Sequence, residues 1–182
     1  MARKRGNNEG TVFKERNSYR VQLTIDGQRI SKSFKSEQDA IAWKSAQLGD
    51  VQTGTFVQQN NVSLADWVFE YLQVYAKPRV AVRTFERYLS LIAHLESISQ
   101  YKLQDLRPIH LQSVINNAQS SRRNYKQKTE NGEPTITYVP ASPSSKKKIH
   151  NLLNMAFKQA VKDGLVKINP MQAVSIELQS IK

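Results

Sequence analysis

The sequence contains no cysteine, which excludes disulfide bonds and metal sites built on thiolate ligands. It also lacks long apolar runs: no stretch approaches the roughly 20 residues that a bilayer-spanning helix needs. No apolar segment follows the basic N-terminus MARKRGNNEG, as one would in a signal peptide. Acidic residues are few, with 15 Asp and Glu against 27 Lys and Arg. These absences predict a protein of the reducing cytoplasm with no membrane partner.

Positive charge is what the chain has in excess. Its net charge is +12 over 182 residues, and such an excess predicts a polyanionic partner, most often nucleic acid, with a membrane surface as the second candidate. A hydrophobic content of 39% favours folded cores over global disorder. The length allows one domain of ordinary size or two small ones.

Patterns that carry catalysis or bind metals are missing. The sequence has no Gly-rich phosphate loop, no paired carboxylates and no Ser-His-Asp arrangement. The histidines do not have metal-ligand spacing; they are His94, His110 and His150. We therefore expect no cofactor, no metal and no catalysis by this chain alone.

The N-terminal part shows the pattern of a small sheet with one helix. Tyr19–Ile25 alternates strictly between apolar and polar residues, and Asp26-Gly27 is a strong signal for a two-residue hairpin. Flanking strands are predicted at Thr11–Arg16 and Arg29–Phe34. Ser36 is expected to cap the following helix.

The remainder of the chain is predicted to be helical. Its apolar stripes at spacings of 3, 4 and 7 residues predict four helices and a short fifth. A polar stretch between the third and fourth helices reads as a loop, or a loop with a small hairpin. The predicted starts are Ser63, about Arg83 with Thr84 as a cap candidate, Pro108, Ser142 and Pro170, with the polar stretch at 119–145.

The expected fold class is α+β. A small three-stranded antiparallel sheet with one helix would precede an all-α domain of four to five helices. Gly54 and a run of Gln and Asn mark a linker between them. The predicted divisions are a flexible basic arm at 1–10, the βββα domain at 11–49, the linker at 50–62 and the helical domain at 63–178.

The polar face of the predicted sheet carries cations and amides and little acid. A sheet of two or three strands fits the major groove of B-DNA and reads base edges through Arg and Gln. The alternative is an ordinary solvated face. The candidate DNA-binding residues of this unit are Arg16, Arg20, Gln22, Thr24, Arg29 and Lys32.

Two helix starts in the second domain offer further contacts. The fourth helix opens with three successive lysines, although the helix dipole disfavours positive charge there. A strongly negative partner would explain them, and so would plain solvent exposure. Hydroxyls and cations near free backbone amides suit phosphate contact. The candidates are Arg83, Thr84, Arg87 and Tyr88 on the second helix, and Ser144, Ser145, Lys146, Lys147, Lys148, His150 and Asn151 on the fourth.

Four stretches, spread in order over residues 10–175, resemble the tyrosine recombinases, the integrases of phages and conjugative transposons. The stretches are GTVFKERNSYRVQLTIDGQRISKSFKSEQDAIAWK, VRTFERYLSLIAHL, YKLQDLRPIHLQSVIN and SPSSKKKIHNLLNMAFKQAVKDGLVKINP. The resemblance implies an arm-binding domain followed by a SAM-like core-binding domain. The insertion at 119–142 departs from the shorter loop common in the family.

The resemblance implies partners and roles. The β unit would bind arm-type DNA repeats, and the helical domain would form half of a C-shaped clamp at the core or crossover site. Thr84, Arg87 and Tyr88 would lie toward the DNA, as would the start of the fourth helix. Other recombinase protomers or an accessory DNA-bending or excision factor are implied partners. The implied location is the cytoplasm of a bacterium or phage-infected host, at the nucleoid.

One departure concerns catalysis. Family members continue into a catalytic domain with a tyrosine nucleophile, whereas no tyrosine follows Tyr138 here. We therefore expect this chain not to cleave DNA. It would be the DNA-binding region of a recombinase or, alternatively, a naturally short regulator that represses or competes at the sites. The rivals from other classes are an RNA- or ribosome-associated basic protein and an enzyme acting by itself.

Overall fold

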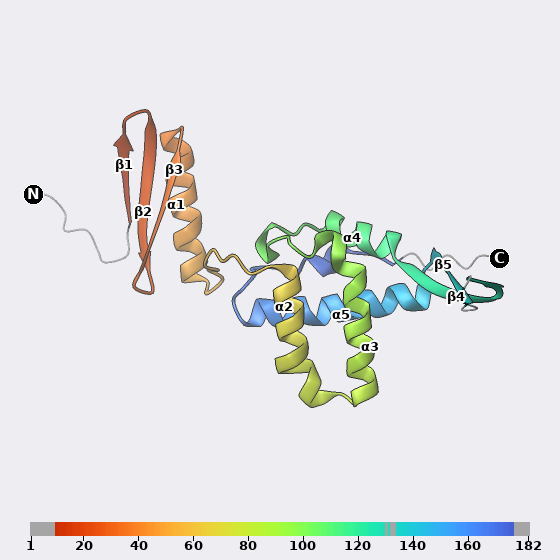
Figure 1. Ribbon diagram of the computed structural model, residues 1–182. Helices are drawn as coiled ribbons and strands as arrows, with labels where there is room; N and C mark the ends of the chain where they lie inside the picture. Colours follow the sequence, from red (N-terminus) through yellow and green to blue (C-terminus); the bar gives the residue numbers. More distant parts are fainter. Residues whose placement is uncertain (1–9, 130, 132–133, 177–182) are drawn as a thin grey trace, which may run out of the picture. The chain divides into compact units, whose positions relative to one another are not determined.

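The computed structural model describes residues 10–129, 131 and 134–176, and the chain divides into two compact units between Phe56 and Val57 (Figure 1). The basic arm predicted at 1–10 lies outside the described residues except for Gly10. In the part of the chain that the structure describes, no helix combines the length and the hydropathy needed to cross a bilayer.

The first unit is a three-stranded antiparallel sheet with one helix. Its strands β1 (Thr11–Glu15), β2 (Ser18–Ile25) and β3 (Gln28–Phe34) lie in the order β1-β2-β3, and helix α1 (Glu37–Gln52) follows. The Ser36 hydroxyl accepts from the Gln38 amide at 3.2 Å, which confirms the predicted helix cap. The predicted α+β fold class is confirmed.

The alternation of β2 sets the two faces of this sheet. Val21, Leu23 and Ile25 are buried and pack with Ala40 of α1, while the residues between them point the other way. The tight turn at Asp26-Gly27 has positive φ at both positions, 50° and 78°, as a hairpin turn of type I′ requires.

Gly10 enters the sheet at a position that admits no side chain. Its φ is +62°, and a Cβ there would overlap Leu23 Cδ2 and lie 2.9 Å from the Gln22 carbonyl oxygen. We expect Gly10→Ala to destabilise the sheet unit by about 1–3 kcal/mol, because the αL strain and the overlap add. Amide hydrogen exchange of β2 in the intact chain measures this loss locally.

The matched control is Gly49→Ala, in α1, where a Cβ meets nothing within 4 Å. Alanine favours a helix over glycine by about 1 kcal/mol, so this control keeps or raises protection. Equal protection of β2 in the two variants would contradict the expectation for Gly10.

The second unit is mainly helical. Its elements are α2 (Leu64–Tyr71), a π turn (Leu72–Ala76), a 3₁₀ turn (Lys77–Arg79), α3 (Val82–Ile92) with its 3₁₀ extension (Ala93–Ile98), a 3₁₀ turn (Leu103–Asp105), α4 (Pro108–Asn117), strands β4 (Gln119–Lys128) and β5 (Pro134–Pro140), α5 (Pro143–Lys162) and a 3₁₀ turn (Pro170–Ala173).

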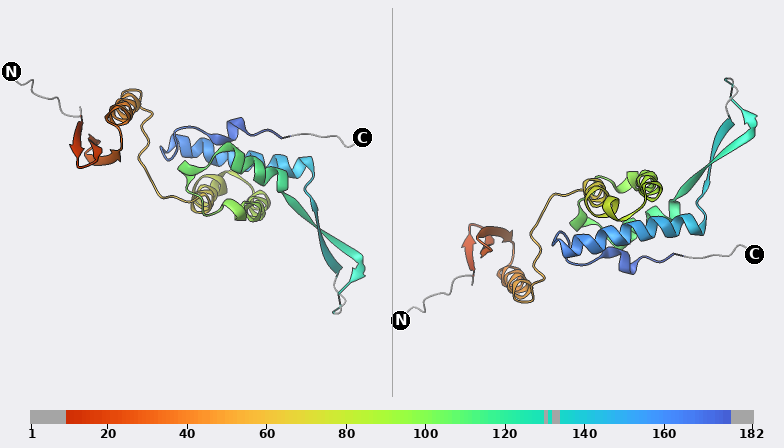
Figure 2. Two further views of the ribbon diagram at one scale, coloured as in Figure 1. Left: turned by 90° about the horizontal axis from the view of Figure 1, so that it is seen from above. Right: turned by 90° about the horizontal axis from the view of Figure 1, so that it is seen from below.

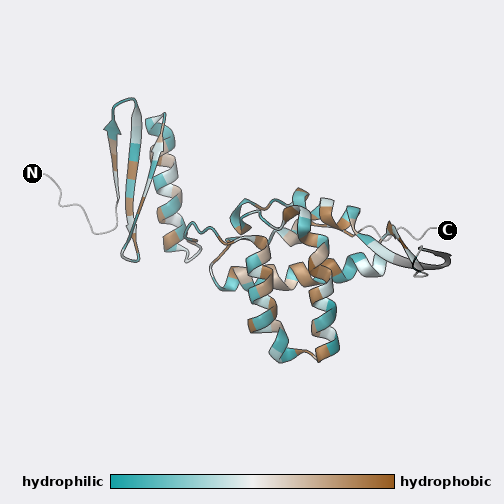
Figure 3. Cartoon of the chain, in the orientation of Figure 1, coloured by the Kyte–Doolittle hydropathy of each residue, from teal (hydrophilic) through white to brown (hydrophobic). Residues whose placement is uncertain are grey.

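Helix α5 supplies the centre of this unit's core. Its stripe from Ile149 to Ala160 is buried against α2, α3 and α4. The indole nitrogen of Trp67 donates to the Ala156 carbonyl at 3.0 Å, which fixes α2 on α5. Figure 3 shows the apolar residues alternating with hydrophilic ones along the helices, as the periodicity of the sequence predicts.

Two details of the helical unit differ from the sequence prediction. Thr84 does not cap α3, because the helix begins earlier, with Ala81 at the cap position and no side-chain cap bond. The domain predicted as all-α also contains the antiparallel pair β4-β5, which confirms the small hairpin allowed for the polar stretch. Strand-favouring Thr, Ile, Tyr and Val in TITYV account for β5, so the unit is not wholly helical.

Several residues of the segment predicted as a linker, 50–62, are bonded to or packed on one of the two units. Helix α1 runs on to Gln52, and Phe56 packs against the core of the sheet unit. On the other side, Asn60 Nδ2 donates to the Leu165 carbonyl at 3.0 Å, and Gln104 Nε2 donates to the Gln58 carbonyl at 2.8 Å. Side-chain amides therefore tie the second half of this segment to the helical unit.

Candidate nucleic-acid interface

The outer face of the sheet gathers four of the predicted DNA-binding residues. Arg20, Gln22 and Thr24 point away from the buried face of β2, and Arg29 of β3 is paired with Thr24. Residues directly opposite in an antiparallel pair share a face. The register therefore brings these four side chains together.

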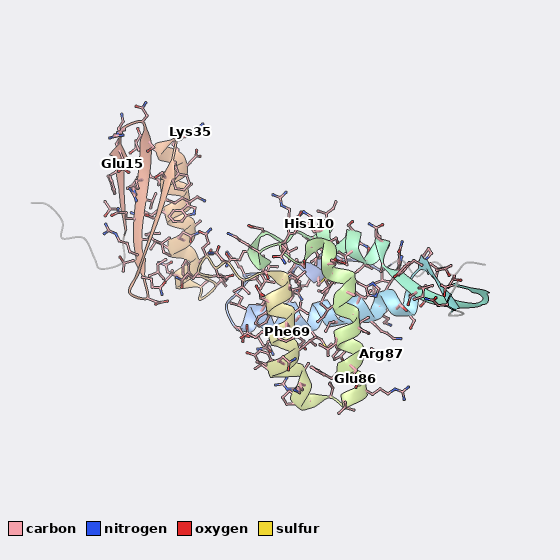
Figure 4. All side chains as sticks on the ribbon, in the orientation of Figure 1. Glu15, Lys35, Phe69, Glu86, Arg87 and His110 are labelled. Carbon is pink, nitrogen blue, oxygen red and sulfur yellow. The ribbon has the colours of Figure 1, made fainter. Side chains whose placement is uncertain are left out.

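Neighbours within the sheet hold the side chains of this face. Arg20 Nη1 lies 3.2 Å from Glu15 Oε2, and the guanidinium of Arg29 donates to Gln22 Oε1. Glu15, labelled in Figure 4, thus brings an acid to a face where the sequence predicted little. The carboxylate of Glu15 compensates the charge of Arg20 within the protein, so Arg29 is the stronger candidate for a contact with an anion.

Two predicted residues of this unit lie elsewhere. Lys32 is paired with Val21, which places it on the helix side of the sheet, with its ammonium 5.5 Å from the Phe34 ring centre and 5.7 Å from that of Trp43. A cation over two aromatic rings is stabilised within the unit. Arg16 belongs to the turn between β1 and β2, with φ of 52°, and not to a strand.

In the helical unit, α3 and α5 enclose a groove of about 380 Å³. The lining residues of each wall are spaced three or four positions apart along their helix, so each wall is one helix face. The groove joins the two surfaces that the sequence predicted separately. Its lining is Thr84, Arg87, Tyr88 and Leu91 from α3, and Lys148, Asn151, Asn154 and Met155 from α5.

The groove has an apolar floor and a polar rim. Leu91 is buried, whereas Arg87 (Figure 4) is exposed and Lys148 is half-buried. A hydrogen bond fixes the Asn154 side chain, since Nδ2 of the buried Asn169 donates to Asn154 Oδ1 at 2.8 Å. Fixed amides and cations around a concave surface suit contacts with phosphates and base edges.

Tyr71 of α2 lies near Tyr88, which belongs to the α3 wall. Burial raises the pKa of the Tyr71 phenol above its usual value, the nearby Tyr88 raises it further, and Arg79 opposes the shift. Tyr71 therefore stays neutral at physiological pH, so it adds no negative charge beside the cations of this region.

Three predicted residues at the start of α5 are engaged inside the protein. Lys146 Nζ donates to the Asn116 carbonyl at 3.0 Å, at the negative end of α4. His150 Nε2 lies 3.3 Å from the Val174 carbonyl oxygen. The Ser145 amide donates to the hydroxyl of Ser142, the cap of the helix. These side chains serve packing and capping, away from the groove.

The other predicted residues of this surface are exposed but do not line the groove. They are Arg83, Ser144 and Lys147. Conversely, sequence reasoning missed Leu91, Asn154 and Met155. The signal was available for Asn154, which follows Lys148 and Asn151 at intervals of three along the same helix.

Comparison with known families identifies part of this unit. Residues 63–119 match the family model of the phage integrase N-terminal SAM-like domain. This segment resembles the SAM-like domain of phage integrases. The match confirms, for these residues, the resemblance to phage integrases that the sequence predicted. The SAM-like domain contributes the α3 wall of the groove, while the α5 wall follows the matched segment in the chain.

Three solved structures share features with the chain. A solution structure of a Clostridium leptum fragment, residues 61–160, is 21% identical with a TM-score of 0.48, over 66% of this chain and 93% of that one. A lambda integrase (75–356) dimer bound to a COC' core site is 20% identical with a TM-score of 0.46, over 63% of this chain and 36% of that one.

A further lambda integrase dimer on a COC' core site is 16% identical with a TM-score of 0.47, over 96% of this chain. The matches span 36% and 47% of the two lambda integrase chains. A search of curated proteins found no match.

Proposed function

We propose that this chain binds duplex DNA as the N-terminal region of a site-specific tyrosine recombinase that integrates or excises a mobile element. The observation that carries the proposal is the groove between α3 and α5, where cations and amides from two separate stretches of sequence converge. Its α3 wall lies within the segment that matches the phage integrase N-terminal SAM-like domain.

The groove is the proposed surface for the core site. Arg87 and Lys148 stand on opposite walls, where they can neutralise phosphates and fix the register of the protein on the duplex. Asn151, exposed on the same wall as Lys148, can reach a base edge with both its donor and its acceptor.

The outer face of the sheet is the proposed surface for arm-type repeats. A short sheet enters the major groove with its polar side chains toward the bases. On this face the guanidinium of Arg29 donates to Gln22 Oε1, so the two side chains hold each other in place. Together they present hydrogen-bond donors and an acceptor to the bases. Less conformational entropy is lost on binding when such side chains are already ordered.

Two modest DNA-binding surfaces on one chain support each other. Binding at one surface raises the effective concentration of the other at its own site, provided that the DNA lets both engage. Further recombinase protomers and an accessory DNA-bending factor are the protein partners that this proposal implies. The role assigned to this chain is to position DNA, and DNA cleavage is assigned to none of the described residues.

The proposal is tested at the groove with Arg87→Ala and Lys148→Ala. Each substitution removes one charged contact, and we expect each to weaken binding to a selected DNA duplex by about tenfold. Titration of a fluorescently labelled duplex at fixed salt measures the change. The double variant is expected to lose both contributions, because the two residues lie on different walls.

The matched control is Lys102→Ala, which removes an equal charge from an exposed position outside the groove. It should weaken binding less than twofold, since distant exposed charges are screened. If all three variants bind equally well, the groove is not the DNA surface and the proposal fails.

A further inference from the structure

The β4-β5 ribbon belongs to the helical unit, but none of its described residues lines the α3–α5 groove. Both views of Figure 2 show its strands extending away from the helices as a twisted pair, from the end of the unit where α5 begins. The base of the ribbon is fixed, since Ala118 and Ala141 are buried and the Ala141 amide donates to the Ala118 carbonyl at 2.8 Å. The ribbon therefore leaves the core from a firm point beside the first turn of α5.

Two large hydrophobic side chains of β5 are exposed to solvent. Ile136 is 58% exposed and Tyr138 is 70% exposed, and their spacing of two residues puts them on one face of the strand. A two-stranded ribbon by itself is marginally stable in water, because it buries too little apolar surface. This ribbon gains stability when a partner covers that face.

The charge of the opposite strand indicates which partner fits. β4 reads QSSRRNYKQK, with four Arg or Lys and no acid. The register pairs Arg123 with Ile136 and Ser121 with Tyr138, so the basic sequence of β4 runs directly alongside the apolar residues of β5. An apolar protein surface would have to desolvate the cations, whereas a nucleic-acid duplex neutralises them and releases its own counterions.

We infer that the β4-β5 ribbon is an additional DNA contact, which places Ile136 and Tyr138 in the minor groove beside the segment held between α3 and α5. The inference rests on the proposed function, because it requires duplex DNA at the α3–α5 groove. Proteins that bind the minor groove combine arginine with apolar side chains that insert between base steps, and this ribbon offers that combination.

The place of the ribbon in the fold supports the same partner. Lys148 lies within about two turns of the start of α5, and the ribbon joins α5 at that start. The exposed Ser144 and Lys147 lie between the ribbon and Lys148 along the helix. A duplex seated on the first turns of α5 would therefore lie next to the base of the ribbon.

Hydroxyl-radical footprinting of the full chain tests this inference, on a duplex that the chain enriches from a randomised pool. The variant is Ile136→Ser/Tyr138→Ser. We expect it to keep the protected stretch that depends on Arg87, to lose protection of the flanking minor groove and to bind about tenfold more weakly. Phe69→Ser, at a 55% exposed position of α2, is the matched control and should leave the footprint unchanged.

The outcomes separate the ribbon from the groove. Both variants should melt at the temperature of the unmodified chain, because they alter exposed side chains. A ribbon variant with the full-length footprint overturns the ribbon inference and leaves the proposed function standing. If the ribbon variant binds with fewer protein copies per duplex than the unmodified chain, the ribbon inference is overturned, and the ribbon contacts another protein copy instead of DNA. Failure of the unmodified chain to enrich or protect any duplex overturns the inference and the proposed function together.

Discussion

The affinity of this chain for its DNA site should fall by about a thousandfold when monovalent salt is raised from about 50 mM to about 200 mM. Each phosphate that a Lys or Arg neutralises releases condensed counterions, and that release becomes less favourable as the bulk salt concentration rises. The logarithm of the binding constant therefore falls linearly with the logarithm of the salt concentration, with a slope set by the number of contacts.

The described surfaces supply about six such contacts, which gives a slope of about −5. They are Arg20 and Arg29 on the sheet, Arg87 and Lys148 at the groove, and Arg83 and Lys147 on the exposed turns beside it. Titrations of one labelled duplex at four or five salt concentrations measure the slope.

Substitution of one contact calibrates this measurement. Arg87→Ala should reduce the magnitude of the slope by about one, while Lys102→Ala should leave it unchanged. A binding constant nearly independent of salt would show that DNA phosphates are not the main partner. Duplex RNA of the same sequence completes the test, because A-form RNA hides its major groove from side chains and should bind more weakly if the surfaces read DNA.

Phe157→Ala should destabilise the helical unit by about 3–5 kcal/mol. The Phe157 side chain is fully buried in the middle of α5, and truncation leaves a cavity that the packed neighbours cannot fill. That loss is a large fraction of the roughly 5–15 kcal/mol by which a domain is stable. Because α5 forms one wall of the groove, DNA binding by the helical unit should be lost with the fold.

Urea unfolding of the intact chain measures this effect, with Trp67 as a reporter inside the affected core. Its indole is bonded to Ala156, the residue next to Phe157. The matched control is Val161→Ala, at a 37% exposed position of the same helix, which should cost less than about 1 kcal/mol. Equal losses in the two variants would mean that α5 is not the centre of the core.

Local patterns predicted the elements of the first unit well. Apolar and polar residues alternate along β2, and Asp26-Gly27 fixes the hairpin, so the register of β2 on β3 follows from short-range signals. The register in turn decides that Arg20, Gln22 and Thr24 share the outer face. Arg16 was misplaced because a turn residue with positive φ depends on its neighbours. Lys32 was misplaced although alternation carries the signal, since it is three residues from Arg29 in β3 and therefore on the opposite face.

The helical unit shows the limit of the same reasoning at the start of α5. Three lysines on the first turns looked alike in the sequence, and they have three different environments. Lys146 is bonded to the last turn of α4, Lys147 is exposed, and Lys148 lines the groove. The dipole of α4 explains in part why a lysine is tolerated at the start of α5. The positive charge of Lys146 is disfavoured by the dipole of α5 but favoured at the C-terminal end of α4.

The sequence by itself determined the α+β fold class, the cap at Ser36, the core stripe of α5 and the excess of positive charge, because each depends on composition or on spacings within one element. Only the tertiary structure decided which charges face outward together. Arg87 and Lys148 are 61 positions apart in the sequence (148 minus 87) and line one groove because α3 packs against α5. Packing between distant segments follows from side-chain complementarity across the whole core, which no local pattern contains.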